Sequence, residues 1–125
     1  MYDIYYAHHQ WKYGTQVEQY ELDLIKRYFP NANVCNPSVD FHFPESATEE
    51  QIMKHCLHTV RNSDILVFSS MDGIVGTGVY HEVEEAEKAR KLVFYIFHNE
   101  LYAGAKLEQL PKCDQTDRLY AYVRL

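Results

Sequence analysis

The chain has 125 residues, of which 46% are hydrophobic and 24% charged, and its formal net charge is −6 at pH 7. This size and composition are typical of one globular domain, which we expect to span residues 1–125. The negative charge disfavours polymeric nucleic acid as a partner, because such binders need a basic face. No apolar run approaches the ~18 residues of a membrane span, and no signal-peptide-like segment opens the sequence, so we expect a soluble protein without membrane association.

Cysteine usage predicts the cellular compartment. Cys35, Cys56 and Cys113 are odd in number and widely spaced. Such a set argues against a disulfide framework and favours the reducing cytoplasm.

The N-terminal part of the chain has the pattern of a strand, a loop and a helix. Residues 2–7 are rich in β-forming residues and predict the first strand, and residues 8–14 predict the loop after it. Thr15 and Glu18 predict a capping box at the start of a helix, which Pro30 ends. The apolar side chains at helical spacing predict the inner face of this helix: Val17, Tyr20, Leu24, Ile25 and Tyr28.

Two further helices and four further strands follow. Residues 32–35 predict a short second strand, 36–47 a loop long enough to cover a site, and Thr48 with Gln51 a second capping box. The elements expected after that helix are a third strand in 64–68, a helix in 79–90, a fourth strand in 91–97 and a last strand in 119–123.

The alternation of strands and helices predicts an α/β fold. Consecutive apolar residues at 65–68 are typical of a parallel strand covered on both faces. We therefore expect a three-layer sandwich with a mostly parallel, flavodoxin-like or Rossmann-like sheet of about five strands. In such sheets ligands bind at the carboxyl ends of the strands, so we expect the site among the loops at 8–14, 36–47 and 69–78 and after Phe97.

Glu82 is the first candidate for chemistry. It follows the turn Gly76-Thr77-Gly78, in or just beyond the first turn of the expected helix. The helix dipole there favours an ionised carboxylate, which could stabilise or trap a sugar carbocation, as in retaining glycosidases. The alternative is a solvated acidic cluster with the neighbouring glutamates 84, 85 and 87.

Other polar residues near the strand ends are candidates for substrate contacts. Asp72 could act as a general acid or accept a ribose hydroxyl, although Asp-Gly is also a common turn pair. Tyr5 could orient the Glu82 carboxylate, or simply pack. A phosphate could bind Ser69, Ser70 or the backbone N–H groups of the glycine turn, which includes Gly76 and Gly78. Four histidines could protonate a leaving base or contact phosphate: His8, His9, His42 and His81.

The spacing of these residues argues against several cofactors. No histidine pair has a familiar ligand spacing, so we expect no metal. The glycines at 73, 76 and 78 form neither the dinucleotide fingerprint nor a P-loop, which disfavours a dinucleotide-reducing enzyme or a nucleoside triphosphatase.

Four short segments form a pattern that spans nearly the whole chain. They are Ile4-Tyr5-Tyr6-Ala7, Ser63-Asp64-Ile65-Leu66-Val67, the stretch from Gly76 to Ala86, and Lys91-Leu92-Val93-Phe94. The pattern resembles the nucleoside 2-deoxyribosyltransferase superfamily, which includes deoxynucleoside-monophosphate N-glycosidases. The segment around Glu82 is the most specific of the four.

The resemblance implies a flavodoxin-like sheet, Glu82 as nucleophile, Tyr5 orienting it, a homodimer and no metal or organic cofactor. The chain departs from the family at Cys56, where the family carries an aspartate eight residues before Asp64. His55 and Asp72 are the residues that could replace that aspartate. His81 and the bulky Val79-Tyr80 pair indicate a reshaped pocket and hence a diverged member.

Three functions remain open from the sequence. The first is an enzyme, a hydrolase or transferase, that acts on the N-glycosidic bond of a nucleoside or nucleotide. The second is a nucleotide-binding or sensing module without catalysis, which Cys56 favours. The third is a hydrolase of NAD or a related nucleotide signal.

Overall fold

The computed structural model describes residues 1–71, 74–97, 99–103 and 119–121, and these residues form an α/β fold around a five-stranded sheet. The strand order is β2-β1-β3-β5-β6. The first four strands are parallel, and β6 runs antiparallel to β5. The strands of the sheet are β1 (Asp3–Ala7), β2 (Asn33–Cys35), β3 (Ile65–Ser69), β5 (Leu92–Phe97) and β6 (Glu100–Ala103).

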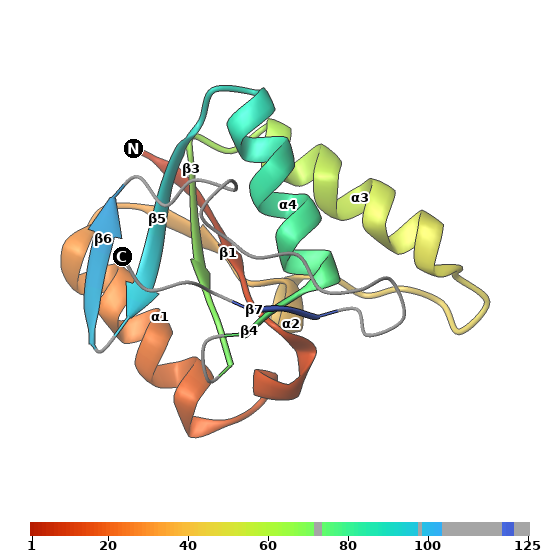
Figure 1. Cartoon of the computed structure of the whole chain (residues 1–125), viewed down its shortest axis with the longest axis horizontal. Coiled ribbons are helices and arrows are strands. Elements are labelled where there is room, and N and C mark those ends of the chain that lie inside the picture. Colours follow the sequence, from red (N-terminus) through yellow and green to blue (C-terminus); the bar gives the residue numbers. More distant parts are fainter. Residues whose placement is uncertain (72–73, 98, 104–118, 122–125) are drawn as a thin grey trace.

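Helices cover both faces of the sheet and make it the middle of three layers (Figure 1). On one face lie α3 (Glu49–Arg61) and α4 (Thr77–Lys88), and on the other lies α1 (Gln16–Tyr28). A 3-10 helix (Gln10–Lys12) and the short α2 (Pro37–Asp40) belong to the loops after β1 and β2. The expected three-layer α/β sandwich with a mostly parallel sheet is confirmed.

The core consists of two clusters that the sheet separates. Because successive side chains of a strand point to opposite faces, Tyr5 of β1 packs under α3 and α4, whereas Ile4 and Tyr6 pack over α1. Both tyrosines are fully buried. The hydroxyl groups of Tyr5 and Tyr6 therefore lie on opposite faces of the sheet, each in a different core cluster.

The inner face of α1 differs from the face that its apolar residues predicted. Leu24 and Ile25 are buried as expected. The other buried residues on this face of α1 are Glu18 and Glu21, each 6% exposed. The predicted inner residues Val17, Tyr20 and Tyr28 lie on the exposed side. The reason is that both glutamates have partners in the loop after β1 and in the sheet, so their burial is compensated.

The helix starts follow the expected capping chemistry with two differences. Thr48 and Gln51 form the predicted capping box at α3. At α1, Thr15 accepts from the backbone of Glu18, but the Glu18 side chain accepts from Gly14 and bonds His8 instead of closing the box. Helix α4 begins at Thr77, two residues earlier than expected.

The C-terminal strands also differ from the prediction. The fifth strand of the sheet is β6, a strand not predicted from the sequence, and it pairs antiparallel with β5. The strand expected at 119–123 is present as β7 (Leu119–Ala121), but it pairs with β4 (Ile74–Gly76) in a separate two-stranded sheet. Asp72 and Cys113 lie outside the described residues. Within the described ranges, none of the helices has the length and apolar character that a membrane crossing requires.

Candidate active site

The carboxylate of Glu82 is buried between α4 and the sheet. Glu82 is the sixth residue of α4, which places it in the second turn of the helix, and it is only 7% exposed. The hydroxyl of Tyr5 donates a hydrogen bond to its Oε2 atom. The predicted contact between these residues is therefore present, and the solvated acidic cluster does not describe Glu82.

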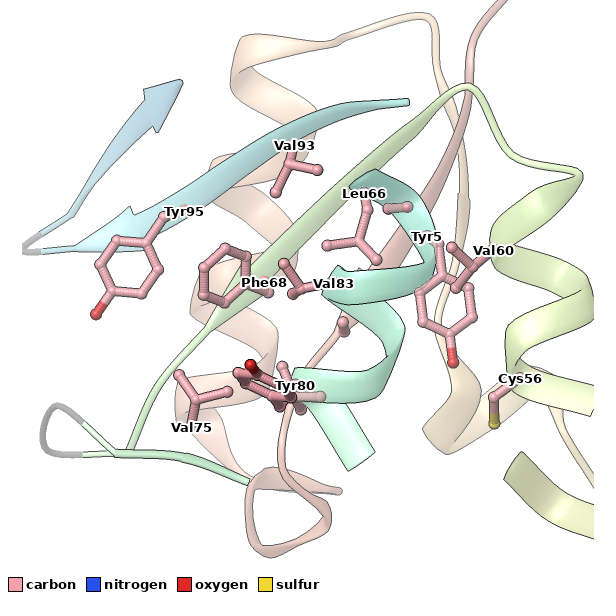
Figure 2. Close-up of a cluster of buried hydrophobic side chains, with 13 residues drawn as sticks. Tyr5, Cys56, Val60, Leu66, Phe68, Val75, Tyr80, Val83, Val93 and Tyr95 are labelled. Carbon is pink, nitrogen blue, oxygen red and sulfur yellow. The ribbon is translucent and has the colours of Figure 1, made fainter. Parts of the chain in front are cut away.

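The thiol of Cys56 belongs to the same buried group. Cys56 lies on the inner face of α3, 8% exposed, and its side chain interacts electrostatically with those of Tyr5 and Glu82. Figure 2 shows Tyr5 extending from β1 toward Cys56, with its hydroxyl directed to the same region as the sulfur. The position at which the chain departs from the family pattern thus lies within the candidate site. We call Tyr5, Cys56 and Glu82 the Glu82 cluster.

Burial decides the charge of the Glu82 cluster. Loss of hydration raises the pKa of Glu82 from 4.5 to about 7, although the hydrogen bond from Tyr5 and the interaction with Cys56 act in the opposite direction. Desolvation therefore outweighs the helix dipole, and at neutral pH Glu82 is present in both its protonated and its ionised form. Burial, followed by the Glu82 charge, also raises the pKa of Tyr5 and raises that of Cys56 to about 11.

The glycine turn before α4 lies against the loop that follows β1. A Cβ atom added to Gly76 would lie 2.7 Å from Cδ2 of His9, which is closer than carbon atoms can approach without displacement. Gly76 is also the N-cap of α4. At Gly78 an added Cβ would lie 3.3 Å from Cε of Met53. The glycines thus allow the start of α4 to approach the loop at 8–14 and helix α3.

A buried lysine fixes that loop to the end of β3. The Lys12 ammonium is 2.9 Å from Glu21 Oε2, 2.8 Å from Ser69 Oγ and 2.7 Å from the carbonyl oxygen of Ser70. The Ser69 hydroxyl and the Tyr6 hydroxyl both donate to Oε1 of Glu21. Ser69, predicted as a phosphate contact, therefore already has two internal partners, and we assign it to the scaffold.

His8 belongs to a second buried pair. Its Nε2 is 2.6 Å from Glu18 Oε2, its Nδ1 is 3.1 Å from the carbonyl oxygen of Tyr6, and its ring stacks on the Tyr6 ring. Burial lowers the pKa of His8 despite the nearby carboxylate. Because both ring nitrogens have protein partners, His8 is placed to hold the loop after β1 and not to contact a ligand.

Two further residues have features of ligand contacts, one beside the Glu82 cluster and one just after β2. Burial, and then the charge of Glu82, raises the pKa of Tyr13, whose side chain contacts His8 while the residue remains 40% exposed. Asn36, 6% exposed at the end of β2, has an Nδ2 atom without a hydrogen-bond partner among the described residues. A buried amide donor of this kind needs a ligand or a water molecule. A lone asparagine in a loop gives no such signal in the sequence.

The remaining predicted residues contact other side chains or lie outside the described part of the chain. His81 is exposed on α4, with Nδ1 3.8 Å from Glu84 Oε1. Ser70 hydrogen-bonds the Tyr95 hydroxyl at 2.8 Å. Asp72 is outside the described part of the chain. In that part, no three histidine, cysteine or carboxylate side chains are grouped so as to hold a metal ion.

The fold and the site together define a doubly wound α/β protein with a buried, protonatable carboxylate on one face of its sheet. In comparisons with protein-family models, curated proteins and solved structures, the chain has no significant match.

Proposed function

We propose that the protein cleaves or transfers the N-glycosidic bond of a nucleoside or nucleotide, with Glu82 as the nucleophile. The observation that carries this proposal is the pairing of a buried carboxylate with a tyrosine hydroxyl beside the glycine turn that opens α4. The resemblance of four sequence segments to the nucleoside 2-deoxyribosyltransferase superfamily gives independent support. Under this proposal Tyr5 is the positioning residue that orients the attacking oxygen.

The proposed reaction takes place at the anomeric carbon. An oxygen of ionised Glu82 attacks C1′ as the C1′–N bond breaks, and the electron pair of that bond leaves with the base, which takes a proton from a donor or from water. Water, or a second base in a transferase, then attacks C1′ and releases Glu82 as a carboxylate. A pKa of about 7 leaves a large fraction of Glu82 ionised at neutral pH.

Substrate contacts are available around the Glu82 cluster. The half-exposed ring of Tyr13, which senses the charge of Glu82, could contact a base or sugar. Asp72, Gly76, Gly78 and His81 remain proposed contacts for the sugar or phosphate. We propose no metal and no organic cofactor for this reaction.

The test is release of free base from a panel of nucleosides, nucleotides and NAD, followed by mass spectrometry. We expect wild-type protein to release a base, and Glu82→Gln and Glu82→Ala to release none while the circular dichroism spectrum of the fold is retained. Full activity in both variants would exclude Glu82 as nucleophile. Release of nicotinamide from NAD alone would assign the protein to the third function, the NAD hydrolases.

The second candidate is a nucleotide-binding module without catalysis. Cys56 favours it, because a thiol with a pKa of about 11 is a weak proton donor where the resembling family has a carboxylic acid. This function predicts calorimetric binding of a nucleotide with no base released during long incubation. Detection of turnover would count against it.

The assembly and compartment are proposals of the same kind. The resemblance implies a homodimer, which light scattering at the elution peak would test directly. Cys35 and Cys56 are free thiols, and we propose the reducing cytoplasm as the compartment.

A further inference from the structure

A groove on the outer side of α3 carries a row of basic residues. It has a volume of about 560 Å³ and lies between the exposed side of α3 and the loop before it, whose wall includes Phe43 and Ala47. The groove side of α3 presents Lys54, His55, His58 and Arg61. We call this feature the α3 groove. It lies on the opposite side of α3 from Cys56, which faces the core.

The charge of the α3 groove is opposite to that of the whole chain. The chain has a net charge of −6, yet none of the residues that line the groove is acidic. Lys54 has no ion-pair partner among the described residues, whereas Arg61 bonds Glu85 at 2.8 Å and remains half exposed. The glutamates at 45, 49 and 50 flank the other end in the sequence. The positive charge is therefore concentrated toward the C-terminal half of α3.

The groove also has apolar surface that a charged ligand alone would not use. The Phe43 ring is 37% exposed and lies 5.5 Å from the His55 ring, edge to face. Ala47 extends this wall. A ligand that fits both features must carry negative charges and apolar groups side by side.

The two charged side chains of the groove lie apart along α3 and indicate an elongated ligand. Lys54 and Arg61 are about 10 Å apart along the helix axis, and the His58 ring between them accepts a hydrogen bond from Asn62 Nδ2 through Nε2. Acidic residues at alternate positions of an extended peptide repeat every ~6.6 Å, so neighbouring carboxylates can reach both Lys54 and Arg61. A small phosphate needs donors that converge on one point, and enclosed pockets usually bury most of a small ligand. The α3 groove has neither property.

We propose that the α3 groove binds an extended acidic peptide segment of a partner protein, with its carboxylates over Lys54 to Arg61 and its apolar side chains against Phe43. This docking surface is independent of the function proposed for Glu82. The mode of recognition combines charge complementarity with one aromatic anchor.

The test measures fluorescence anisotropy of a labelled peptide with glutamate at alternate positions and leucine or phenylalanine between them. The full chain is compared with Lys54→Glu in the groove and with Lys26→Glu, an exposed control on α1 with the same change in charge. We expect Lys54→Glu to weaken binding about tenfold or more and Lys26→Glu to change it less than about twofold. Phe43→Ser should weaken it several-fold at unchanged salt dependence.

Three results would overturn the proposal. The first is no binding by wild type up to about 100 μM peptide. The second is equal weakening by both charge reversals, which would indicate general electrostatic attraction. The third is displacement of the peptide by pyrophosphate or a nucleoside monophosphate at concentrations similar to that of unlabelled peptide, which would identify a small-phosphate site. Circular dichroism of each variant excludes unfolding as the cause.

Discussion

Tyr5 and Tyr6 are adjacent on β1, yet their hydroxyls donate to carboxylates on opposite faces of the sheet. Tyr5 reaches Glu82 on α4, and Tyr6 reaches Glu21 on α1. The environments of the two acids differ. Glu21 has Lys12 as a counter-ion, whereas the partners of Glu82 are a phenol and a thiol. This difference explains why burial leaves Glu82 with a pKa near neutrality and marks it as the acid available for chemistry.

The first prediction concerns stability and pH. Burial raises the pKa of Glu82 from 4.5 to about 7. At pH values between these two, Glu82 is therefore mostly protonated in the folded state and mostly ionised in the unfolded state. Glu82 therefore makes the free energy of unfolding fall as pH rises from about 4.5 to 7, by roughly 3 kcal/mol in total. Glu82→Gln should remove this fall and gain stability relative to wild type above pH 7.

Urea denaturation of both proteins at pH 5 and pH 8 measures this effect. The quantity to compare is the change in the free energy of unfolding between the two pH values. His8, whose pKa is lowered, contributes a change of the opposite sign, but it does so equally in both proteins, so the difference between them reports Glu82. An equal change of stability with pH in wild type and Glu82→Gln would contradict the raised pKa.

The second prediction concerns Tyr5. Its hydrogen bond lowers the pKa of Glu82, so Tyr5→Phe should raise that pKa above about 7. If Glu82 is the nucleophile, the acid limb of the pH profile for base release should move to higher pH. Tyr102→Phe, at an exposed tyrosine whose hydroxyl donates to Glu100, is the control and should leave the profile unchanged. A profile that stays in place in Tyr5→Phe would contradict the positioning role.

The third prediction concerns the buried lysine. Lys12→Met leaves the Glu21 charge buried without a counter-ion and should lower the free energy of unfolding by about 3–5 kcal/mol. The double variant Lys12→Met/Glu21→Gln removes that charge and keeps acceptors for Tyr6 and Ser69, so it should recover most of the loss. Chemical denaturation measures both, with exposed Lys26→Met as a control expected to change stability by less than about 0.5 kcal/mol. A double variant as unstable as the single one would argue that lost packing dominates.

The fourth prediction concerns the contact between Gly76 and His9. Gly76→Ala should destabilise the protein by about 1–3 kcal/mol, because its Cβ would overlap the imidazole ring. His9→Ala removes the ring and should make the alanine at 76 much less costly. A double-mutant cycle separates this coupling from the loss of the glycine N-cap and of the His9 cap on Trp11. Additive effects would show that the ring moves aside freely.

Much of the fold was predictable because local patterns agree with it. The apolar run at β3 is consecutive since both faces of that strand are covered, and the capping box of Thr48 and Gln51 marks the start of α3. The two faces of the sheet follow from the alternation of strands and helices. The pairing of Tyr5 with Glu82 was predictable in part, because the end of the first strand and the glycine turn were both expected at the carboxyl ends of the parallel strands.

The rest depends on contacts between distant segments. Glu18 and Glu21 look like solvent-facing residues in the sequence, and only their partners in the loop after β1 explain why they replace Val17 and Tyr20 on the inner face of α1. The raised pKa of Glu82 has a similar origin, since a helix dipole can be inferred from the local sequence whereas desolvation is a property of the whole fold. β6 has no clear period in its sequence and forms because β5 offers it a free edge.

The ends of the five-stranded sheet have a consequence for self-association. Its outermost strands are β2, with three residues, and β6, with four, whereas β5 inside has six. Short outermost strands expose few unpaired backbone N–H and C=O groups, so a strand of another chain has few groups with which to pair. The arrangement protects the long apolar interior strands from templating fibrous aggregates.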